Sequence, residues 1–407
     1  MGSRVRTWLA NLVNDVMIEQ APTAYARSMA AVTPRKLWLA EEGDCVVTLA
    51  PCSPAMREYV ASVTGVRMES IDVVAPAQLT PVHACTVIEA LGATDTVVQR
   101  PELIPFVVDR LSVAFARKSG LRIPPYRPVP EPRTVAAIRR INTKDGFRRV
   151  ASGLGLPIAD GGYAATPEEL TSALRRFLAS HDAAIVKMNR SSNGSGTFVV
   201  TASDLSIGHG WTDATAPPQC GWVYEEFLPF DATPSVEMVV DESGPQEYYV
   251  CDQRTRDNAW TGMITPAPDR PHLIRAAIQI GKWLHDRGYR GYFDVDCGLV
   301  GDRFVVTEAN VRRTGGTYLE QLARRLCSLV TPHWRSDARP GTRRLDFFGA
   351  VNALDRAGLA DPHAEARAIL LADTLDVDGK WRYLVVGRTA DAAAAVENEL
   401  VDLLRLT

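Results

Sequence analysis

A proline-rich segment is the strongest constraint on how this chain can fold. Residues 123–133, IPPYRPVPEPR, hold five prolines in eleven positions. Proline lacks an amide hydrogen and restricts its own backbone, so this segment favours an extended connector over a helix. A chain of 407 residues is also long enough for two or three domains of roughly 150 residues each. We therefore predict that residues 1–133 form one domain and that a second domain begins at residue 134.

Short apolar runs alternate with helical stretches before this connector. Residues 36–40, 45–51 and 71–76 have the length of strands, and residues 105–118 have a helical pattern. Such alternation is typical of an α/β domain with a small parallel sheet, and we predict a Rossmann-like arrangement. No glycine fingerprint follows any of these runs, so the sequence predicts no dinucleotide site in this domain.

The first apolar stretch predicts a helix. Six apolar residues recur at helical spacing, namely Trp8, Leu9, Leu12, Val13, Val16 and Met17. Asn11, Asn14 and Asp15 interrupt the stretch, so we do not expect it to be the apolar core of a signal peptide. We expect an amphipathic helix that packs on its own domain.

Composition argues against several classes of protein. The net charge of −3 and the pI near 6.2 give no general attraction to nucleic acid or to an anionic membrane. No apolar run approaches the roughly 18 residues that span a bilayer. Seven cysteines, without a C-x-x-C pair, are typical of reduced thiols and not of disulfides or a zinc site. We expect a cytoplasmic protein whose partners include neither nucleic acid nor a membrane.

The rest of the chain predicts a mixture of helices and paired strands. Helices are expected at 134–141, from Lys144 onward, at 167–179 and at 272–287. Strands are expected at 184–189, 197–200, 222–228, 235–240 and 247–251, followed by a hairpin of residues 291–300 and 304–310. Further on, helices near 347–357 and 390–404 flank a strand at 381–387. We predict an α+β domain over residues 134–340 and a small α+β domain over residues 341–407.

Four polar residues alternate along the predicted hairpin. Residues two apart in a strand share a face, so Asp294 and Asp296 point the same way, and so do Glu308 and Asn310. Magnesium prefers oxygen ligands, commonly one or two carboxylates together with phosphate oxygens and water. We predict that Asp294, Glu308 and Asn310 bind magnesium. The alternative is that they form the solvated face of an exposed hairpin.

The magnesium prediction depends on the register of this hairpin. A two-residue turn places Asp294 opposite Ala309, and therefore on the other face of the sheet from Glu308. A three-residue connection over 300–302 places Asp294 opposite Glu308, and bulged hairpins of that length are common. We therefore predict the three-residue connection.

Two arginines and two glycines follow the hairpin. A guanidinium binds a carboxylate or phosphate through two parallel hydrogen bonds, so Arg312 and Arg313 are candidates for binding a substrate. The glycines Gly315 and Gly316 provide a backbone that a ligand can approach closely. The alternative for Arg313 is a surface salt bridge.

Two lysines adjoin segments that suit an anion. Lys187 precedes the loop 190–196, RSSNGSG, which contains Ser195 and whose small residues let backbone amides surround phosphate oxygens. Lys144 begins a predicted helix, where the backbone dipole favours negative charge. The phosphate-loop pattern G-x-x-x-x-G-K-[ST] is absent from the sequence.

Residues 251–263 form a predicted loop in which charge is concentrated. Arg254 and Arg256 lie in this loop, and we predict that they contact a substrate. A surface loop with its own ion pairs explains the same charges equally well. No residue in the sequence stands out as a general base.

Several motifs occur in an order that resembles the ATP-grasp superfamily. They are N-x-K at 142–144, V-K at 186–187, E-E-F-L at 225–228, F-D-V-D at 293–296 and T-E-A-N-x-R at 307–312. The resemblance covers residues 134–330, and the last motif with its preceding Asp is the most specific part. The run T-E-A-N-V-R-R-T-G-G looks most like the peptide ligases of the pheganomycin type.

The resemblance implies an architecture of α/β and α+β parts. An ATP-grasp fold over residues 134–340 would follow an N-terminal Rossmann-like pre-ATP-grasp domain and precede a small C-terminal α+β domain. It also implies ATP and Mg²⁺ as cofactors, with Asp294, Glu308 and Asn310 on the metal. Arg312 would bind the substrate carboxylate or the phosphoryl intermediate, and together with Lys187 it would be a catalytic cation.

The nucleotide site is implied in the same way. Lys144 and Lys187 would hold the ATP phosphates. The hinge would bind adenine through its backbone, with the Glu225 side chain at the adenine amino group, and comprises Glu225, Glu226, Phe227 and Leu228. Many relatives place an acid after the hinge to contact ribose, whereas this chain has Thr233 there and Asp231 or Glu237 as substitutes.

The implied function is that of an ATP-dependent ligase. A carboxylate would be activated as an acyl phosphate and coupled to an amine, forming an amide or peptide bond with release of ADP and phosphate, as in natural-product biosynthesis. The substrates would be a small carboxylic acid or amino acid and an amine or peptide acceptor, and a homodimer is one option for the assembly. The alternatives are a carboxyphosphate-type carboxylase and a non-catalytic ATP-binding regulatory protein.

Overall fold

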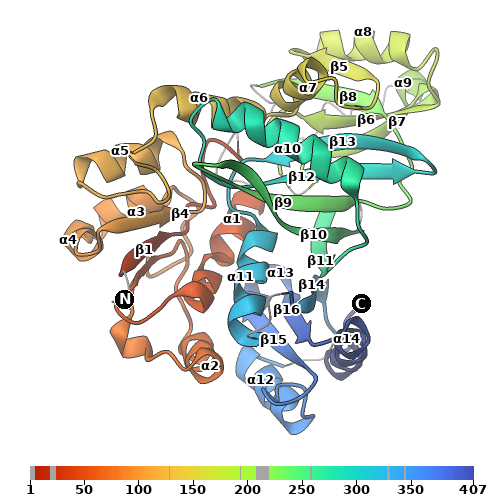
Figure 1. The fold of residues 1–407 in the computed structure, drawn as a ribbon. Coiled ribbons are helices and arrows are strands. Elements are labelled where there is room, and N and C mark those ends of the chain that lie inside the picture. The colour runs from red at the N-terminus through yellow and green to blue at the C-terminus, as the bar shows by residue number, and fades with distance from the viewer. Residues whose placement is uncertain are drawn as a thin grey trace.

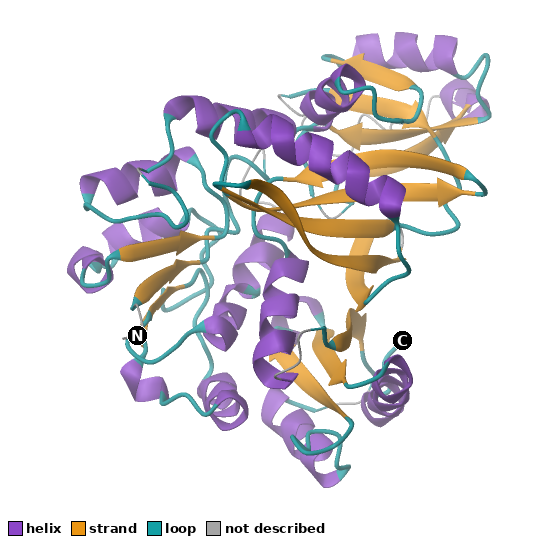
Figure 2. Cartoon of the chain, viewed as in Figure 1, coloured by secondary structure: helices purple, strands orange, loops and turns teal. Residues whose placement is uncertain are grey.

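The fold, taken from a computed structural model, contains three β-sheets within the residues that the structure describes (Figures 1 and 2). The structure describes residues 5–18, 24–127, 129–192, 194–207, 220–256, 259–327, 331–342 and 345–407. The four-stranded sheet of the leading segment lies at one side of the molecule, and a second four-stranded sheet lies at the opposite corner. An eight-stranded sheet lies between this corner and the C-terminal helices.

The leading segment is an α/β domain with a parallel sheet, as predicted. Its strands run in the order β3-β2-β1-β4 and all pairs are parallel. The strands are β1 (Arg6–Leu9), β2 (Cys45–Val47), β3 (Asp72–Val74) and β4 (Glu102–Pro105). The helices are α1 (Ala24–Ala31), η1 (Thr33–Leu39), α2 (Pro54–Thr64), η2 (Met68–Ser70), α3 (Ala84–Ala90), α4 (Thr94–Val98) and α5 (Arg110–Lys118).

Two predictions within this domain are wrong. The helix expected over residues 8–17 is instead strand β1 followed by turns, because side chains of the intervening asparagines bond the backbone. The Asn14 side chain accepts hydrogen bonds from the amides of Val16 and Met17, both at 3.0 Å. Residues 36–40, expected as a strand, lie largely in the 3₁₀ helix η1, which has Pro34 in its first turn.

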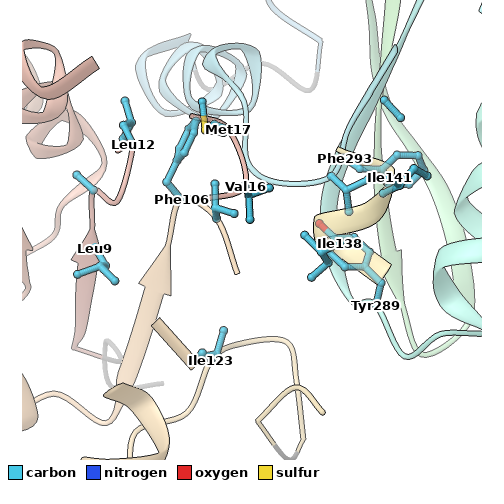
Figure 3. Close-up of a cluster of buried hydrophobic side chains, with 14 of the residues drawn as sticks. Leu9, Leu12, Val16, Met17, Phe106, Ile123, Ile138, Ile141, Tyr289 and Phe293 are labelled. Atoms are coloured by element: carbon cyan, nitrogen blue, oxygen red, sulfur yellow. The ribbon is translucent and has the colours of Figure 1, made fainter. Parts of the chain in front are cut away.

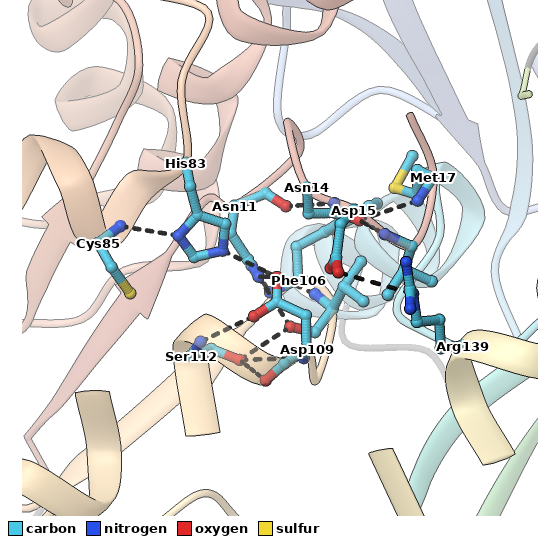
Figure 4. Close-up of polar contacts among 12 residues, drawn as sticks. Asn11, Asn14, Asp15, Met17, His83, Cys85, Phe106, Asp109, Ser112 and Arg139 are labelled. Carbon is cyan, nitrogen blue, oxygen red and sulfur yellow. Dashed lines mark hydrogen bonds and ion pairs between the residues drawn. The ribbon is translucent and has the colours of Figure 1, made fainter. Parts of the chain in front are cut away.

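A buried polar network holds the turn after β4 against the segment after β1 (Figure 4). The Asp109 carboxylate accepts hydrogen bonds from Asn11 Nδ2 at 3.0 Å and from the Ser112 amide at 2.7 Å. His83 Nδ1 accepts from the Cys85 amide, so its Nε2 carries the proton and donates to Asp109 at 2.8 Å. The network therefore fixes residues 105–109 against the residues that follow β1.

Two helices and a small sheet follow the proline-rich segment. Helices α6 (Pro132–Ile141) and α7 (Lys144–Gly153) come first, and Thr143 caps α7 by accepting from the Gly146 amide. The small sheet has the order β5-β8-β6-β7 and its own apolar core. Its elements are β5 (Gly161–Ala164), α8 (Pro167–Phe177), β6 (Ala183–Met188), β7 (Thr197–Thr201), α9 (Ala202–Ile207) and β8 (Trp222–Glu226).

The largest sheet has the order β13-β12-β9-β10-β11-β14-β16-β15 and every pair in it is antiparallel. Its first strands are β9 (Pro234–Asp241), β10 (Gly244–Arg256), β11 (Ala259–Thr265), β12 (Gly291–Val300) and β13 (Arg303–Asn310). Helix α10 (Pro271–His285) lies across one face of them (Figure 1). Residues 251–263, predicted as a loop, therefore belong mostly to the strands β10 and β11.

The C-terminal segment extends this sheet. Strand β14 (His333–Pro340) pairs with β11 on one side and with β16 (Lys380–Gly387) on the other, and β15 (Ala366–Ala372) adds the edge. The helices of this part are α11 (Gly315–Cys327), α12 (Phe347–Arg356), α13 (Leu375–Asp378) and α14 (Ala390–Leu404). The proposed boundary at 340/341 thus falls at the end of a strand inside one continuous sheet, and the three-domain division remains a prediction.

An apolar core joins the leading domain to the large sheet (Figure 3). It includes Leu9 and Phe106 from the leading domain and Phe293 from β12, all fully or nearly fully buried. Ile138 and Ile141 of α6, both 0% exposed, belong to the same core, and Figure 3 shows them beside Phe293. Because α6 contributes to a core shared by both parts, the leading domain and the large sheet are held together by buried apolar surface.

We expect Ile138→Ala to lower the free energy of unfolding by about 2–5 kcal/mol, because it removes methylene groups and leaves a cavity in this shared core. Urea unfolding followed by circular dichroism measures the loss. Leu111→Ala is the control, since the Leu111 side chain on α5 is 46% exposed and its truncation should cost little. A loss for Ile138→Ala no larger than that of the control would contradict the role assigned to α6.

Candidate active site

The hairpin of β12 and β13 carries an acidic row on one face, reached by a register that differs from the prediction. Val300 pairs with Arg303, so the turn has two residues and the predicted three-residue connection is wrong. A β-bulge between Asp296 and Cys297 leaves Thr307 unpaired and shifts the register by one residue.

The bulge changes which residues face each other across the hairpin. Asp294 lies opposite Asn310, and Asp296 lies opposite Glu308. The pairing predicted between Asp294 and Glu308 is therefore wrong. All four side chains nevertheless share one face of the sheet, because the bulge shifts the register by one residue and so compensates for the two-residue turn. An even turn alone would have put the two strands' polar residues on opposite faces.

Strand β9 adds a further carboxylate to the row. Glu237 pairs with Asp294, and its side chain is 1% exposed. The hydroxyl of Thr314 donates to Glu237 at 2.9 Å, and the hydroxyl of Thr317 donates to its other oxygen. We call Glu237, Asp294, Asp296, Glu308 and Asn310 the acidic row.

The carboxyl groups of this row destabilise one another's charged forms. Burial, together with the charge of Glu237, raises the pKa of Asp294 to about 8. Burial raises the pKa of Glu237 to about 7, and burial with the neighbouring charges of Asp294 and Glu308 raises the pKa of Asp296 well above its usual range. A cation placed among these oxygens would oppose each of these shifts.

The row contains ligands of the kind that magnesium prefers. The atoms that could bind the metal are carboxylate and amide oxygens. Asn310 Nδ2 and Gln253 Nε2 donate hydrogen bonds of 3.2 and 2.6 Å to Asp296. In the described ranges, no group of three or more His, Cys, Asp or Glu side chains is gathered closely enough to hold a metal alone. Carboxylate and amide oxygens suit a magnesium ion that also takes phosphate oxygens and water.

Lys144 approaches the acidic row from helix α7. Its Nζ donates to the Ser191 carbonyl at 3.0 Å and lies 3.7 Å from Glu308 Oε1. Burial lowers the pKa of Lys144, and the charge of Glu308 partly opposes this effect. The first position of α7 thus brings an ammonium group beside a predicted metal ligand, as both predicted roles require.

Lys187 forms a buried ion pair on the small sheet. Its Nζ lies 2.6 Å from Glu225 Oε2, and Arg148 Nη1 lies 2.5 Å from Glu225 Oε1. Burial alone would raise the pKa of Glu225, but the two cations and the hydrogen bonds that they donate lower it. The carboxylate of Glu225 is therefore occupied by cations, and Arg148 is a neighbour that the sequence did not single out.

The rest of the predicted hinge lies at the end of β8. Glu226 is paired with Arg303 at 3.0 Å, and the amide of Phe227 donates to Ala183 O at 3.1 Å. The amide of Leu228 donates to no backbone group in the part of the chain that the structure describes. A nucleotide contact for the Leu228 amide remains a prediction.

The loop 190–196 is tied to the leading domain on one side. The Arg190 guanidinium, 7% exposed, donates to the carbonyl of Asp15. Ser195 lies in the turn of this loop, with its amide donating to Ser192 O at 3.2 Å. Asn193 of the same loop lies outside the described residues.

Arg312 lies at the end of the acidic row, and its role as a substrate cation remains a prediction. Its Nη2 donates to Asn310 Oδ1 at 2.6 Å, and its side chain is 8% exposed. Arg313 points to other neighbours, donating to Gln321 Oε1 at 3.0 Å and lying over the Tyr292 ring at 4.8 Å. Burial lowers the pKa of Arg313. The surface salt bridge considered for Arg313 is wrong, because the residue is packed between rings.

The glycines that follow are packed against the sheet. A Cβ atom on Gly316 would lie 1.9 Å from Tyr249 Oη and 2.9 Å from Met263 Sδ, and one on Gly315 would lie 3.0 Å from the Trp260 ring. Helix α11 can therefore start close to β10 and β11 only with glycine here. These contacts account for glycine at both positions by packing alone. A ligand contact for either glycine remains a prediction.

Arg254 and Arg256 are not brought to the acidic row. Arg254 pairs with Glu397 of α14, with Nη2 donating to Oε2 at 2.8 Å, and Arg256 donates to Thr407 O at 2.9 Å. Gln253, one residue before, contacts Asp296, and successive residues of a strand point to opposite faces. The expectation that both arginines contact substrate is not supported by this placement, because β10 directs Arg254 to the far face.

Sequence reasoning missed several members of the site. Asp296 and Glu237 were not predicted as part of the metal site, although the alternation of F-D-V-D contains a signal for Asp296. The pairing of β9 with β12 brings Glu237 to the row, and no local sequence pattern predicts this pairing. The leading domain also contributes Tyr25, Arg35 and Lys36, which lie far from the motifs in sequence.

Comparisons with known proteins identify the fold. A family model described as the pre ATP-grasp domain matches residues 33–121. No curated protein sequence matches the chain. N5-carboxyaminoimidazole ribonucleotide synthetase from Thermus thermophilus is 15% identical, with 98% of each chain covered and a TM-score of 0.61.

Two further solved structures are similar over most of their length. Biotin carboxylase from Campylobacter jejuni, in a β-γ-ATP complex, is 13% identical, covering 99% of this chain and 92% of that one with a TM-score of 0.62. N5-carboxyaminoimidazole synthase from Aspergillus clavatus, in complex with ADP and 5-aminoimidazole ribonucleotide, is 14% identical, covering 99% of each chain with a TM-score of 0.56. The chain therefore has the ATP-grasp fold with a pre-ATP-grasp domain at its N-terminus.

The helices of the structure give no sign of a membrane segment. Over the ranges described, none of them combines the length and the apolar character that crossing a bilayer requires.

The Arg254–Glu397 pair leads to a prediction about acid stability. Burial acts to raise the pKa of Glu397, but the hydrogen bonds and charges of Arg254 and Arg335 outweigh it and lower that pKa to about 2. A carboxyl group with a lowered folded-state pKa stabilises the protein above its unfolded pKa of about 4.5 and loses that contribution as the pH falls toward 2.

We expect Glu397→Gln to cost about 3 kcal/mol of unfolding free energy near neutral pH, because it removes the carboxylate that pairs with Arg254 and Arg335 and leaves Arg254 with only Asp337, at 3.7 Å. The difference from the wild type should shrink as the pH falls from about 4.5 to about 2. Urea unfolding over a pH series measures it, with Glu399→Gln on the exposed face of α14 as control. A difference that stays constant over this pH range would contradict the pairing.

Proposed function

We propose that the protein is an ATP-dependent ligase that activates a carboxylate as an acyl phosphate and couples it to an amine. The products are an amide or peptide bond, ADP and phosphate. The finer proposal is a peptide ligase of natural-product biosynthesis, like those of the pheganomycin type. It rests on the run T-E-A-N-V-R-R-T-G-G, which forms the end of β13 and the start of α11.

One observation carries this proposal. Lys144 of α7, predicted to bind phosphate, lies 3.7 Å from Glu308, predicted to bind magnesium. Arg312 extends from the same strand and is bonded to Asn310. An ammonium group, carboxylate and amide oxygens and a guanidinium are therefore neighbours, and these are the kinds of group that phosphoryl transfer to a carboxylate needs.

Magnesium bound by Asp294, Asp296, Glu308 and Asn310 would neutralise the charge of the transferring phosphoryl group. The protein's own cations share that task. Lys144 and Lys187 would bind ATP phosphates, and binding ATP would draw Lys187 from its ion pair with Glu225. Arg312 would orient the carboxylate, since its fork matches two carboxylate oxygens.

The proposed reaction has two chemical steps. A carboxylate oxygen attacks the γ-phosphorus of ATP, the bond from that phosphorus to the bridging oxygen breaks, and ADP leaves. The amine nitrogen then attacks the acyl carbon, the carbon–oxygen bond to phosphate breaks, and the nitrogen loses a proton. Because the acyl phosphate hydrolyses in water, we propose that the loop 190–196 excludes solvent from the site.

A carboxyphosphate-type carboxylase is the second candidate. The solved structures of similar fold include an N5-carboxyaminoimidazole ribonucleotide synthetase, an N5-carboxyaminoimidazole synthase and a biotin carboxylase. In that reaction class the activated carboxylate is bicarbonate. The fold supports both candidates equally, and the identity of the activated acid distinguishes them.

The test of this proposal is ATP turnover with magnesium against pools of amino acids and small carboxylic acids. Hydroxylamine replaces the amine, and ADP, AMP and hydroxamate are measured together. ADP with a matching hydroxamate supports an acyl-phosphate ligase and names the acid. ADP formed only with bicarbonate supports the carboxylase, whereas AMP or nucleotide binding without turnover contradicts the proposed ligase.

We expect Glu308→Gln to lower turnover at least about 10²-fold, because a lost metal-binding charge costs several kcal/mol in such a transition state. Steady-state ADP release measures the effect. The exposed residue Glu58 of α2 provides the control Glu58→Gln, which should behave as the wild type. Turnover of Glu308→Gln within a few-fold of this control would argue against the metal site.

A further inference from the structure

A group of cations lies where the leading domain meets the ATP-grasp part. We call Arg35, Lys36 and Arg312 the basic cluster. The Tyr318 ring lies 5.3 Å from Arg35 Cζ and 5.3 Å from Lys36 Nζ. The Phe106 ring lies 4.8 Å from Lys36 Nζ and 5.9 Å from Arg312 Cζ. Two aromatic rings therefore join the three cations into one group.

The cluster is assembled from two parts of the chain. Arg35 and Lys36 belong to η1 of the leading domain, whereas Arg312 follows β13 and Tyr318 lies in α11. Helix α11 packs against η1, and Figure 1 shows it beside the leading domain. Phe106 follows β4, and its carbonyl accepts from the Arg313 amide at 3.1 Å. The leading domain thus faces the end of the acidic row.

Lys36 is buried without an anionic partner. Its side chain is 4% exposed, and it forms no hydrogen bond or ion pair with any described residue. Contacts with ring faces stabilise a cation modestly, whereas burying an ion without a partner is strongly unfavourable. Burial lowers the pKa of Lys36 well below its usual value, and the charges of Arg35 and Arg313 lower it further. An anion at this position would relieve both effects.

Other polar atoms of the cluster lack partners too. Arg35 Nε, Arg312 Nε and Tyr318 Oη are all buried and form no hydrogen bond within the described ranges. Buried polar groups in proteins are normally paired, so each exception requires an explanation. Three unused donors on neighbouring side chains, together with an unpaired ammonium, suit an anion that has two or more oxygens.

The carboxylates near Arg312 form no ion pair with the cluster in the part of the chain that the structure describes. Glu237, Asp294 and Asp296 interact electrostatically with Arg312, but the oxygens of Glu237 accept from Thr314 and Thr317. The hydrogen bond that Arg312 donates goes to Asn310, which is neutral. No ion pair to Arg35, Lys36 or Arg312 occurs in the described part of the chain. The positive charge of the cluster is therefore left for a ligand.

We propose that the basic cluster binds an anionic group of a substrate, a carboxylate or a phosphate, that is distinct from the carboxylate to be phosphorylated. Lys36 and Arg35 are its main partners, because Arg312 is already bonded to Asn310 on the acidic row. The leading domain then selects a substrate. An amino acid or peptide that enters as the amine carries such a carboxylate. That the group belongs to a ligase substrate rests on the proposed function.

The test measures binding of small anions by titration calorimetry on the full chain. The probes are inorganic phosphate and acetate, each at matched ionic strength in chloride and each with and without saturating Mg-ADP. We expect one of them to bind the wild type saturably in the presence of Mg-ADP, because the cluster is separate from the nucleotide phosphates. Phosphate alone identifies a phosphorylated substrate, and acetate identifies a carboxylate.

We expect Lys36→Met to weaken binding of that anion by about tenfold or more, because a charge-assisted hydrogen bond contributes about 1.5–3 kcal/mol. Mg-ADP binding should be unchanged in Lys36→Met, which also shows that the variant is folded. Lys36→Arg should retain anion binding. Lys282→Met, on the exposed face of α10, is the control and should behave as the wild type.

The outcomes separate this inference from the proposed function. Failure of both anions to bind the wild type, or equal anion binding by Lys36→Met and the control, overturns the anion site, and Lys36 is then a structural residue held by two rings. Failure of Mg-ADP to bind the wild type overturns the nucleotide site instead, and the anion measurements without Mg-ADP still decide the role of Lys36.

Discussion

The β-bulge at Thr307 is the local constraint on which the candidate site depends. The turn between β12 and β13 has two residues, and without the bulge it would direct Asp294 and Asp296 away from Glu308 and Asn310. One unpaired residue restores a common face, and the pairing of β12 with β9 then adds Glu237. Every later feature of the site, from the neighbouring lysine to the arginine at the strand's end, is placed relative to this face.

The site holds two incompletely compensated charge groups side by side. The acidic row has carboxyl pKa values raised by burial and mutual repulsion, and the basic cluster contains Lys36, whose pKa burial lowers. Arg312 lies between them through its bond to Asn310. Like charges are kept together because they belong to strands and helices anchored in large apolar cores. A bound cation and a bound anion would stabilise the two groups in complementary ways.

Much of the order of elements and the fold class followed from local patterns. The α/β alternation of the leading domain, the Thr143 cap of α7 and the shared face of Glu308 and Asn310 depend on neighbours in sequence, which periodicity and capping report directly. The prediction of a helix over residues 8–17 is wrong because the side chains of Asn11 and Asn14 form hydrogen bonds with backbone groups. The spacing of apolar residues carries no information about such bonds. The prediction that Arg254 contacts a substrate is not supported, because its partner in the structure, Glu397, lies 143 residues away in the sequence.

By itself the sequence determined the types of side chain available for chemistry, namely oxygen ligands on alternating strand positions, an arginine after them and lysines beside a small-residue loop. Tertiary structure alone decided the register that puts the oxygen ligands on one face and the pairing of β9 with β12 that adds Glu237. It also decided that Lys36 and Arg312 contact the same aromatic ring. The physical reason is range. Side-chain identity and periodicity are local properties, whereas strand pairing and the burial of unpaired charge arise only when distant segments exclude water together.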